Sequence, residues 1–248
     1  GAATPDLPAT DAALRKALRP LLARGITPVL PGFIGSSPGG EVVTLGRGGS
    51  DLTATLIARA LRASRVNLWK DVPGLLTADP RVVKNARTLP EASYDEAAEL
   101  AYFGAKVLHP ATIVPLVERG IPVWIKNSRR PEAAGTKVIA KATRSDHTVK
   151  SIAWKRGMTI LNLRAPRMLG THGFLKSMFE VFERHGTAVD VVTTSEVSVS
   201  VSLENGAPPA ALLADLGGLG ELTVSRERTI FCVVGEGLRD TPGIPARI

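Results

Sequence analysis

The spacing of apolar residues over the first 142 positions alternates between the period of a helix and that of a short buried strand. Leucines three and four positions apart predict an amphipathic helix over 11–24. Thr10 or Asp11 would cap it, and Gly25 would end it. Further helices are predicted at 52–64, 94–103 and 111–119, and strands at 26–30, 41–45, 66–72 and 121–127. Strands separated by helices predict an α/β fold with a mostly parallel sheet covered on both faces.

Local signals refine this pattern. Ser50 or Asp51 is the expected cap of the second helix, and Ser93 with Glu96 forms a capping box for the third. Pro110 suits the first turn of the fourth helix, which an internal proline would kink or shorten. Residues 73–90 predict a connection longer than usual, a feature common in functional loops.

The pattern of apolar residues changes at about residue 146, within the polar, turn-like stretch at 143–148. The predicted order is a strand at 159–163, a helix at 172–185, strands at 188–194 and 196–203, a helix at 208–216 and a strand at 221–225. This βαββαβ order predicts a ferredoxin-like unit. Apolar runs at 149–154 and 229–235 fall outside that unit, and we interpret them as strands of a second, incomplete one.

Composition narrows the class of protein. The chain has 248 residues, 44% of them hydrophobic, which suffices for one large domain or two ordinary ones. It has no run of about 18 apolar residues, the length that would span a membrane. Its first residues lack the basic and apolar segments of a signal peptide. The single cysteine, Cys232, fits a buried strand position and a reducing cytoplasm.

The charge balance favours small anionic ligands over nucleic acid. Net charge is +8, but no block of five or six like charges occurs and only 4% of residues are aromatic. His172 and His185 have no Cys, His or Asp partners at ligand spacing, so no metal site is expected.

The stretch LGRGGSD at 45–51 is the strongest local candidate for a binding site. Its glycines allow a tight turn and leave backbone N–H groups uncovered. Arg47, Ser50 and Asp51 add a cation, a hydroxyl and a carboxylate at the start of a predicted helix. This combination favours a charged small molecule as the ligand.

Four motifs in fixed order carry a resemblance to a known family. They are GRGGSD at 46–51, DVPG at 71–74, TADPR at 77–81 and FGAKVLHP at 103–110. With these motifs, most of residues 28–136 resembles the aspartokinases, members of the amino acid kinase family. Residues 167–201 resemble the effector-binding segment of the regulatory ACT region of the same family.

The resemblance implies ATP-dependent phosphorylation of the side-chain carboxylate of L-aspartate, with Mg²⁺ bound to the nucleotide. The product would be 4-phospho-L-aspartate, on the route to lysine, threonine and methionine. Residues 1–142 would form the C-terminal portion of a carbamate-kinase-like sandwich that binds nucleotide. Residues 146–248 would form the ACT region, with a first unit at about 156–226 and an incomplete second one.

The resemblance also assigns residues of the kinase site. Arg47, with Ser50 beside it, would hold a substrate carboxylate, because guanidinium groups grip carboxylates through two parallel hydrogen bonds. Asp51 would organise the catalytic lysines, and Lys106 would lie at the phosphates. The implied nucleotide contacts are Lys70, Asp71, Leu76, Arg81, Lys106 and Val107. Related sequences often have threonine in place of Lys70 and tyrosine in place of Leu76. We expect Arg47, Asp51 and Lys106 to converge on one anionic pocket.

The second half predicts an amino-acid effector site. The N–H groups of Gly173, Phe174 and Leu175 begin a helix and suit a carboxylate. Asp190 and Glu196 would hold the amine of the same ligand. The resemblance adds Met168, Val189 and Ser195. It implies lysine as the effector, with threonine second, and a homodimer formed through ACT units.

One motif of the family is missing, and this leaves two alternative functions open. The family's opening motif Lys-Phe-Gly-Gly-Thr-Ser is absent from these residues, so we expect a fragment without the N-terminal half of the kinase domain. We expect little or no kinase activity from this polypeptide alone. A non-catalytic, lysine-binding regulatory subunit is therefore one alternative. Another amino acid kinase, acting on glutamate or acetylglutamate, is the other.

Overall fold

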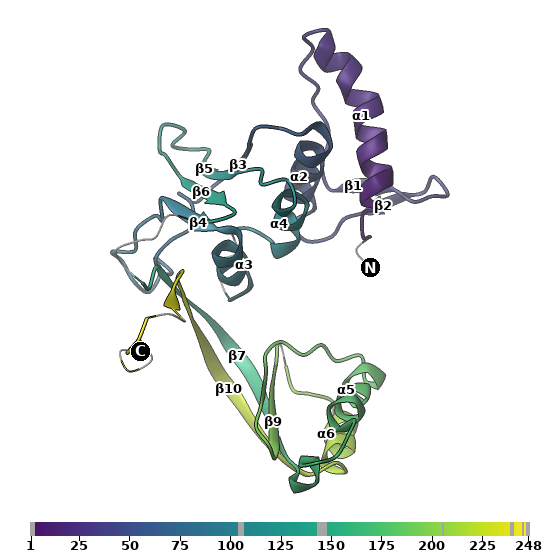
Figure 1. The fold of residues 1–248 in the computed structure, drawn as a ribbon, viewed down its shortest axis with the longest axis vertical. Helices are drawn as coiled ribbons and strands as arrows, with labels where there is room; N and C mark the ends of the chain where they lie inside the picture. Colours follow the sequence, from purple (N-terminus) through teal and green to yellow (C-terminus); the bar gives the residue numbers. More distant parts are fainter. Residues whose placement is uncertain are drawn as a thin grey trace. The chain divides into compact units, whose positions relative to one another are not determined.

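The computed structural model describes residues 3–103, 107–142, 148–204, 206–238, 241–244 and 246 (Figure 1). The chain forms two compact units. The first comprises Gly1–Ala153 together with Cys232–Ile248, and the second comprises Trp154–Phe231. The division therefore lies at different residues from the expected boundary near 143–148, and the end of the chain belongs to the first unit.

The first unit contains both helices and strands, but the predicted alternation is not strict, because β1 and β2, β3 and β4, α3 and α4, and β5 and β6 follow one another directly. The helices are α1 (Leu7–Ala23), α2 (Gly49–Leu61), α3 (Tyr94–Phe103) and α4 (Pro110–Val117). The strands are β1 (Ile34–Ser36), β2 (Val42–Thr44), β3 (Val66–Lys70), β4 (Glu91–Ser93), β5 (Val123–Asn127) and β6 (Thr136–Ile139). The capping box at α3 is confirmed, since the Ser93 N–H donates to Glu96 Oε2 at 2.8 Å and the Glu96 N–H to Ser93 Oγ at 3.1 Å.

The four-stranded sheet of the first unit has the order β3-β5-β6-β4 (Figure 1). The β3–β5 and β4–β6 pairs are parallel, and the β5–β6 pair is antiparallel. Burial alternates along β3 and β5, so one face enters the core and the other does not. On the more open face Trp69 is 49% exposed, and Lys126 Nζ lies 5.3 Å from its ring centroid. Among the described residues, the expectation of a sheet buried on both faces is therefore wrong.

The predicted strand at 26–30 is not formed. Val29 is 94% exposed, although its neighbours are apolar. Pro28 and Pro31 lack N–H groups, so this stretch offers a broken row of donors to any neighbouring strand. The chain instead forms its first strand, β1, between the two predicted strands at 26–30 and 41–45, and β1 pairs antiparallel with β2.

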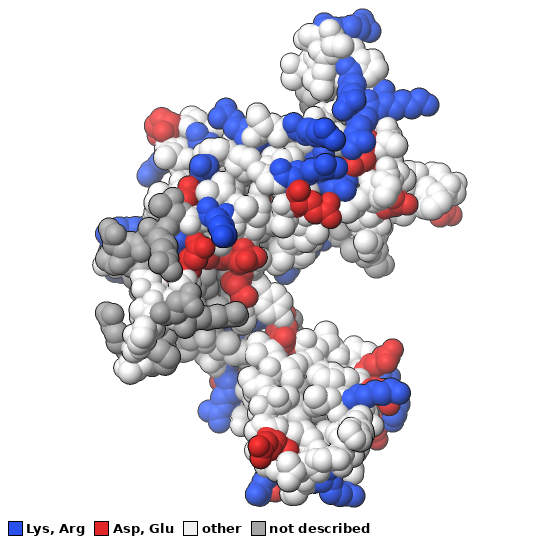
Figure 2. Space-filling view, in the orientation of Figure 1, with Lys and Arg blue, Asp and Glu red and all other residues white. Residues whose placement is uncertain are grey.

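The cap of α1 also differs from the prediction. Asp6 Oδ1 accepts the Ala9 N–H at 3.0 Å, so the helix begins earlier than Thr10 or Asp11. Asp11 points inward instead and is only 6% exposed. Its Oδ2 lies 2.6 Å from Arg59 Nη1 of α2 and 2.9 Å from Arg15 Nη2. Lys and Arg side chains gather along α1 (Figure 2), and Asp11 is the carboxylate that ties this basic helix to α2.

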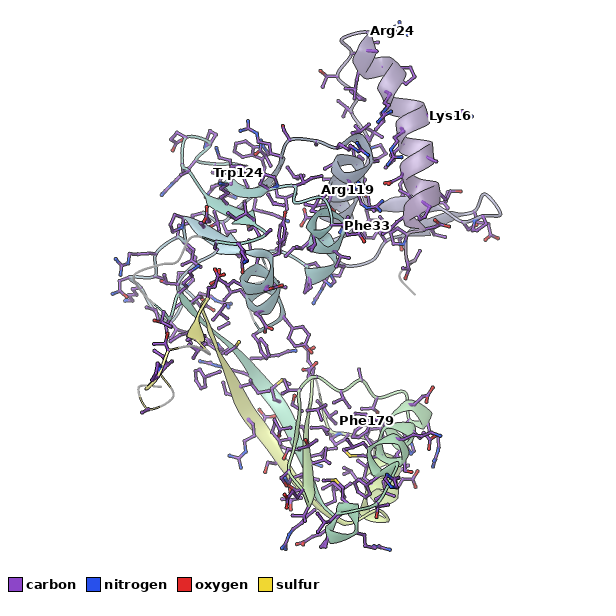
Figure 3. All side chains as sticks on the ribbon, viewed as in Figure 1. Lys16, Arg24, Phe33, Arg119, Trp124 and Phe179 are labelled. Carbon is purple, nitrogen blue, oxygen red and sulfur yellow. The ribbon has the colours of Figure 1, made fainter. Side chains whose placement is uncertain are left out.

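The second unit carries the predicted βαββαβ order. Its elements are β7 (Ser151–Arg164), a short 3₁₀ helix (Pro166–Met168), α5 (Phe174–Arg184), β8 (Val192–Thr194), β9 (Ser198–Leu203), α6 (Ala210–Gly217) and β10 (Glu221–Val234). The sheet order β10-β7-β9-β8 is ferredoxin-like, which confirms the prediction. Phe182 is buried among strand residues of this unit, and Phe174 and Phe179 pack against the same core. Phe179 is labelled in Figure 3.

Two pairs of predicted strands are in fact single long strands. The runs at 149–154 and 159–163 contribute to β7, and those at 221–225 and 229–235 contribute to β10. The polar residues between the two runs of β7 predicted a turn, but Gly157 there has a φ of +71° and the strand continues through it. β7 and β10 are hydrogen-bonded neighbours, and their outer ends, up to Ala153 and from Cys232, belong to the first unit. The second, incomplete ACT unit stays a prediction.

Cys232 lies in β10, half-buried, and packs against the core of the first unit, which confirms its predicted strand position. Burial raises the pKa of its thiol, and the negative charge of Glu99 raises it further. Little thiolate is therefore present at neutral pH, which makes this a poorly reactive thiol. No helix of the described residues is both long and apolar enough to cross a membrane.

Candidate active site at the N-terminus of α2

The glycine-rich turn positions the start of α2. Gly48 is the N-cap, with a φ of +73° in the left-handed region, and no side chain caps the helix. The expectation that Ser50 or Asp51 caps α2 is therefore wrong, because both residues lie in its first turn. A helix that begins without a side-chain cap leaves its first N–H groups available to a ligand, at the positive end of the helix dipole.

A second loop packs against this turn. A Cβ on Gly32 would lie 2.9 Å from the Ser50 Cα, so the backbones approach as closely as glycine allows. The Phe33 N–H donates to Thr53 Oγ1 at 3.1 Å. Phe33 itself has a φ of +76°, an uncommon conformation for a bulky residue and one that often marks functional sites. Figure 3 labels this residue.

An ion pair forms where β3 ends. Lys70 Nζ lies 2.5 Å from Asp51 Oδ2, and the two side chains are only 24% and 18% exposed. The Lys70 carbonyl accepts the Ser128 N–H at 2.8 Å and the Ser128 hydroxyl at 3.0 Å, so the end of β3 is fixed to the residue after β5. Ligands of α/β proteins commonly bind at the carboxyl ends of parallel strands, and these two strands are parallel.

The other predicted kinase residues lie in the turn before α2 and at its start, directly after β3 and shortly before α4. Arg47 and Ser50 are exposed in the same turn as Asp51, and Asp71 is exposed directly after β3. Val107 is half-buried against the core of the first unit. Lys106 lies outside the described residues. The predicted convergence of Arg47, Asp51 and Lys106 thus stays a prediction, whereas the contact between Asp51 and Lys70 is formed.

The long loop at 73–90 holds the remaining two residues. Leu76 forms an isolated antiparallel bridge with Thr88, which folds the loop back on itself. The Arg81 side chain is 85% exposed, and its Nη2 lies 2.6 Å from Asp79 Oδ2. A hydrogen bond and the charge of Asp79 raise the pKa of Arg81. Arg81 is therefore held by its own loop and presents a permanent positive charge to solvent.

The predicted effector residues of the second unit lie at the start of α5 and in the segments that precede and follow it in the sequence. Gly173 is the N-cap of α5, with a φ of +82° and no side-chain cap. Phe174 is half-buried, and Leu175 is 41% exposed. Met168 and Val189 pack against the core of this unit. Ser195 and Glu196 are exposed, and Ser195 Oγ lies 2.8 Å from Ser198 Oγ.

Asp190 already has a cationic partner, which the sequence pattern did not indicate. Lys155 Nζ lies 2.9 Å from Asp190 Oδ2 and 3.1 Å from Glu204 Oε2. Burial would lower the pKa of Lys155, but its hydrogen bonds and the charges of the two carboxylates outweigh burial and raise it. An effector amine at Asp190 would therefore share this carboxylate with the ammonium group of Lys155.

Metal ligands are not clustered in the described part of the chain, where no group of three or more His, Cys, Asp and Glu could hold an ion. His185 Nε2 lies 2.9 Å from Asp215 Oδ2, which gives this histidine a structural partner. The hydrogen bond from His185 is the largest effect on the pKa of Asp215 and lowers it; burial opposes this, and the charges of His185 and Arg184 lower the pKa further.

Gly48 offers a test of the turn. A Cβ on Gly48 would lie 2.7 Å from the His109 Cβ, whereas one on Gly25, which has a similar φ of +76°, would meet nothing within 4 Å. Gly25→Ala should lower the free energy of unfolding by roughly 1 kcal/mol, the cost of the left-handed conformation. Gly48→Ala should cost about 1–3 kcal/mol more through the overlap. Urea unfolding of both variants measures the difference, and equal losses would contradict the close packing of α2 against the start of α4.

Comparisons with known proteins agree with this architecture. The model of the amino acid kinase family matches residues 4–127. Lysine-sensitive aspartokinase 3 of Escherichia coli is 42% identical over 252 residues, covering 98% of this chain and 56% of that protein. The chloroplastic aspartokinase 1 of Arabidopsis thaliana is 49% identical over 178 residues, covering 71% of this chain and 31% of that protein.

Solved structures show the same relationship. The structure of E. coli aspartokinase III in complex with aspartate and ADP has a TM-score of 0.83 at 42% identity, over 99% of this chain and 56% of that one. The aspartate kinase of Clostridium acetobutylicum has a TM-score of 0.82 at 30% identity, over 94% of this chain and 56% of that one. This chain thus spans about half the length of these bacterial relatives. It belongs to the amino acid kinase family, in which its relatives are aspartokinases.

Proposed function

We propose that the chain takes part in the ATP-dependent phosphorylation of the side-chain carboxylate of L-aspartate. The observation that carries the proposal is the uncapped start of α2, where the Asp51–Lys70 ion pair meets the turn that bears Arg47. Solved E. coli aspartokinase III binds aspartate and ADP, which supports both ligands. Residues 1–142 are proposed as the nucleotide-binding part of the kinase domain and 146–248 as the ACT region.

In this reaction a carboxylate oxygen of aspartate attacks the γ-phosphorus while the bond to the β–γ bridging oxygen breaks. The products are 4-phospho-L-aspartate and ADP, and the nucleophile carries no proton that must be removed. Catalysis therefore requires positioning and charge neutralisation more than proton transfer. Arg47 and Ser50 are proposed to hold the substrate, and Asp51 to hold Lys70 where its ammonium group faces the phosphates.

The remaining nucleotide contacts are proposed from the family pattern. Asp71, Leu76, Arg81 and Val107 would surround the nucleotide, and Lys106 would contact its phosphates. Mg²⁺ is proposed to arrive on the nucleotide, because this ion is usually held by one or two carboxylates together with substrate phosphates. Asp71, exposed at the end of β3, is the carboxylate that fits this role. When bound, the ion would neutralise charge on the phosphate oxygens.

The second unit is proposed to bind a regulatory amino acid, lysine first and threonine second. A solved E. coli aspartokinase III contains lysine and aspartate, which supports this assignment. The uncapped N-terminus of α5 at Gly173 suits the effector carboxylate, and Glu196, exposed and close in sequence to Ser195, suits its amine. We further propose a homodimer formed through ACT units, and the cytoplasm as the site of action.

Thermal unfolding of the 248-residue chain with separate ligands tests these assignments. A ligand at 100 times its dissociation constant stabilises the folded state by about 2.7 kcal/mol. MgATP or MgADP should raise the midpoint through the first unit, and lysine should raise it through the second. Glutamate and N-acetylglutamate serve as controls for other amino acid kinases.

The results distinguish an aspartate kinase from a regulatory subunit and from another amino acid kinase. Stabilisation by lysine alone would favour a regulatory subunit over a kinase. Stabilisation by N-acetylglutamate, but not by aspartate with nucleotide, would favour another substrate. Stabilisation by nucleotide and by lysine is the result that the proposal predicts.

A further inference from the structure

Glu96 makes more contacts than a helix cap requires. It lies in the first turn of α3 and is only 6% exposed. Besides the capping bond from the Ser93 N–H, its carboxylate accepts hydrogen bonds from two residues that are distant in the sequence. Lys150 Nζ lies 3.0 Å from Oε1 and 3.1 Å from Oε2, and the Glu236 N–H donates to Oε1 at 2.8 Å. One carboxylate thus joins three segments of the first unit that are far apart in the sequence.

The two distant partners of Glu96 lie at the first-unit ends of β7 and β10. Lys150 directly precedes β7, and Glu236 lies just after the end of β10. The Lys150 N–H also donates to the Val234 carbonyl at 2.9 Å, so the two strand ends are bonded to each other as well. β7 and β10 are the two strands that continue from the first unit into the second. Glu96 therefore holds both connections at the point where they enter the first unit.

Burial makes this arrangement sensitive to displacement. The Lys150 and Glu96 side chains are each only 7% exposed. A buried ion pair adds little net stability compared with apolar packing, but removing one partner leaves an uncompensated charge. Such a pair favours one arrangement of its segments over all shifted ones. If β7 or β10 moves, the ion pair must break or α3 must move with it.

We propose that Glu96 is a latch that couples α3 to both strands leading into the second unit. α3 ends at Phe103, shortly before the proposed nucleotide contact at Val107. A shift of β7 or β10 caused by a ligand in the second unit would thereby reach α3 and the segment after it. Glu96 acts as a positioning residue and touches no reacting atom. The link to ligands rests on the proposed function, whereas the latch itself does not.

Native-state hydrogen exchange of the 248-residue chain tests the latch directly. Glu96→Gln keeps the shape of the side chain but removes its charge and one acceptor. Peptides covering 150–153 and 232–236 should exchange together, about ten-fold faster or more, because local opening becomes easier. Lys150→Met breaks the same pair from the other side and should give the same pattern. Ser93→Ala is the matched control, since it removes one capping bond of α3 and leaves both long-range partners in place.

A second measurement reads the coupling. The dissociation constant of lysine is determined with and without saturating MgADP, for the wild-type chain and for Glu96→Gln. The two constants should differ in the wild type by roughly five-fold or more and become equal in the variant, since allosteric coupling is the ratio between them. Each ligand alone should bind both proteins within about two-fold.

The outcomes separate the latch from the proposed function. If Glu96→Gln and Lys150→Met leave exchange at both strand ends unchanged, or if Ser93→Ala accelerates it equally, the latch is wrong. If the variant keeps the wild-type ratio of lysine constants, the coupling is wrong. If the wild-type chain binds neither ligand, the proposed function fails, and the exchange experiment alone decides whether the latch exists.

Discussion

Asp11→Ala should lower the free energy of unfolding of the first unit by about 3–5 kcal/mol. Arg59 is 8% exposed, and its Nη1 lies 2.6 Å from Asp11 Oδ2. The alternative partner, Glu118, is 3.6 Å away from Nη2 and 71% exposed, so it compensates little. Without Asp11 a guanidinium group would stay buried between α1 and α2 with its charge unbalanced. Urea unfolding, followed by the fluorescence of Trp69 and Trp124, measures the loss.

A control on the same helix isolates the cause. Asp6 caps α1 at the surface, so Asp6→Ala should cost only about 1 kcal/mol. The double variant Asp11→Ala with Arg59→Leu removes both charges, and its loss should be smaller than the sum of the two single losses. Equal losses for Asp6→Ala and Asp11→Ala would contradict a buried ion pair between α1 and α2.

Phe182→Ala should be as damaging in the second unit, with an expected loss of about 3–5 kcal/mol. Phe182 is 2% exposed and lies in the core with Val199 and Val201 of β9. Its removal leaves a cavity that the surrounding strand and helix residues cannot close fully. Hydrogen exchange at the β9 amides reports the stability of this unit specifically.

Leu175→Ala is the matched control on the same helix. Leu175 is 41% exposed, so its truncation should cost below about 1 kcal/mol. If Leu175→Ala and Phe182→Ala accelerate β9 exchange equally, the inward orientation of α5 is wrong. If neither does, α5 contributes no core to this sheet.

Local patterns in the sequence predicted most of the elements, because their causes are local. The capping box at Ser93 and Glu96 depends on residues three positions apart, and both of its bonds are formed. Val199 and Val201 alternate with serines along β9 and are both buried, as the two-residue period of a strand requires. The ferredoxin-like order followed from the order of helix and strand periods alone.

The wrong predictions concern segments whose structure depends on residues distant in the sequence. Residues 26–30 are apolar enough for a strand, but Pro28 interrupts their donors, Pro31 follows directly, and no pairing partner can be deduced from the pattern. Asp11 has the right chemistry for a cap, but Arg59 binds it instead. The runs that form β7 are separated by a polar turn signal, and only their pairing with β10 shows that they are continuous.

The candidate site was predicted in part for the same reason. The GRGGSD motif indicated the turn before α2, since its glycine and charge pattern is local. The contact between Asp51 and Lys70 spans 19 positions and required the fold. The pairing of Lys155 with Asp190 spans 35 positions and was missed, because no local pattern places β7 beside the segment before β8.

The start of α2 and the end of β3 are proposed to form a phosphate-binding site, and calorimetric titration of the chain with ADP tests this site most directly. Lys70→Thr should weaken ADP binding about ten-fold or more, the loss of one charge-assisted contact, and leave adenosine binding within about two-fold. Lys16→Thr on α1 removes the same charge elsewhere and should leave ADP binding unchanged. ADP binding that is insensitive to Lys70→Thr, or equally weakened by Lys16→Thr, would contradict the claim.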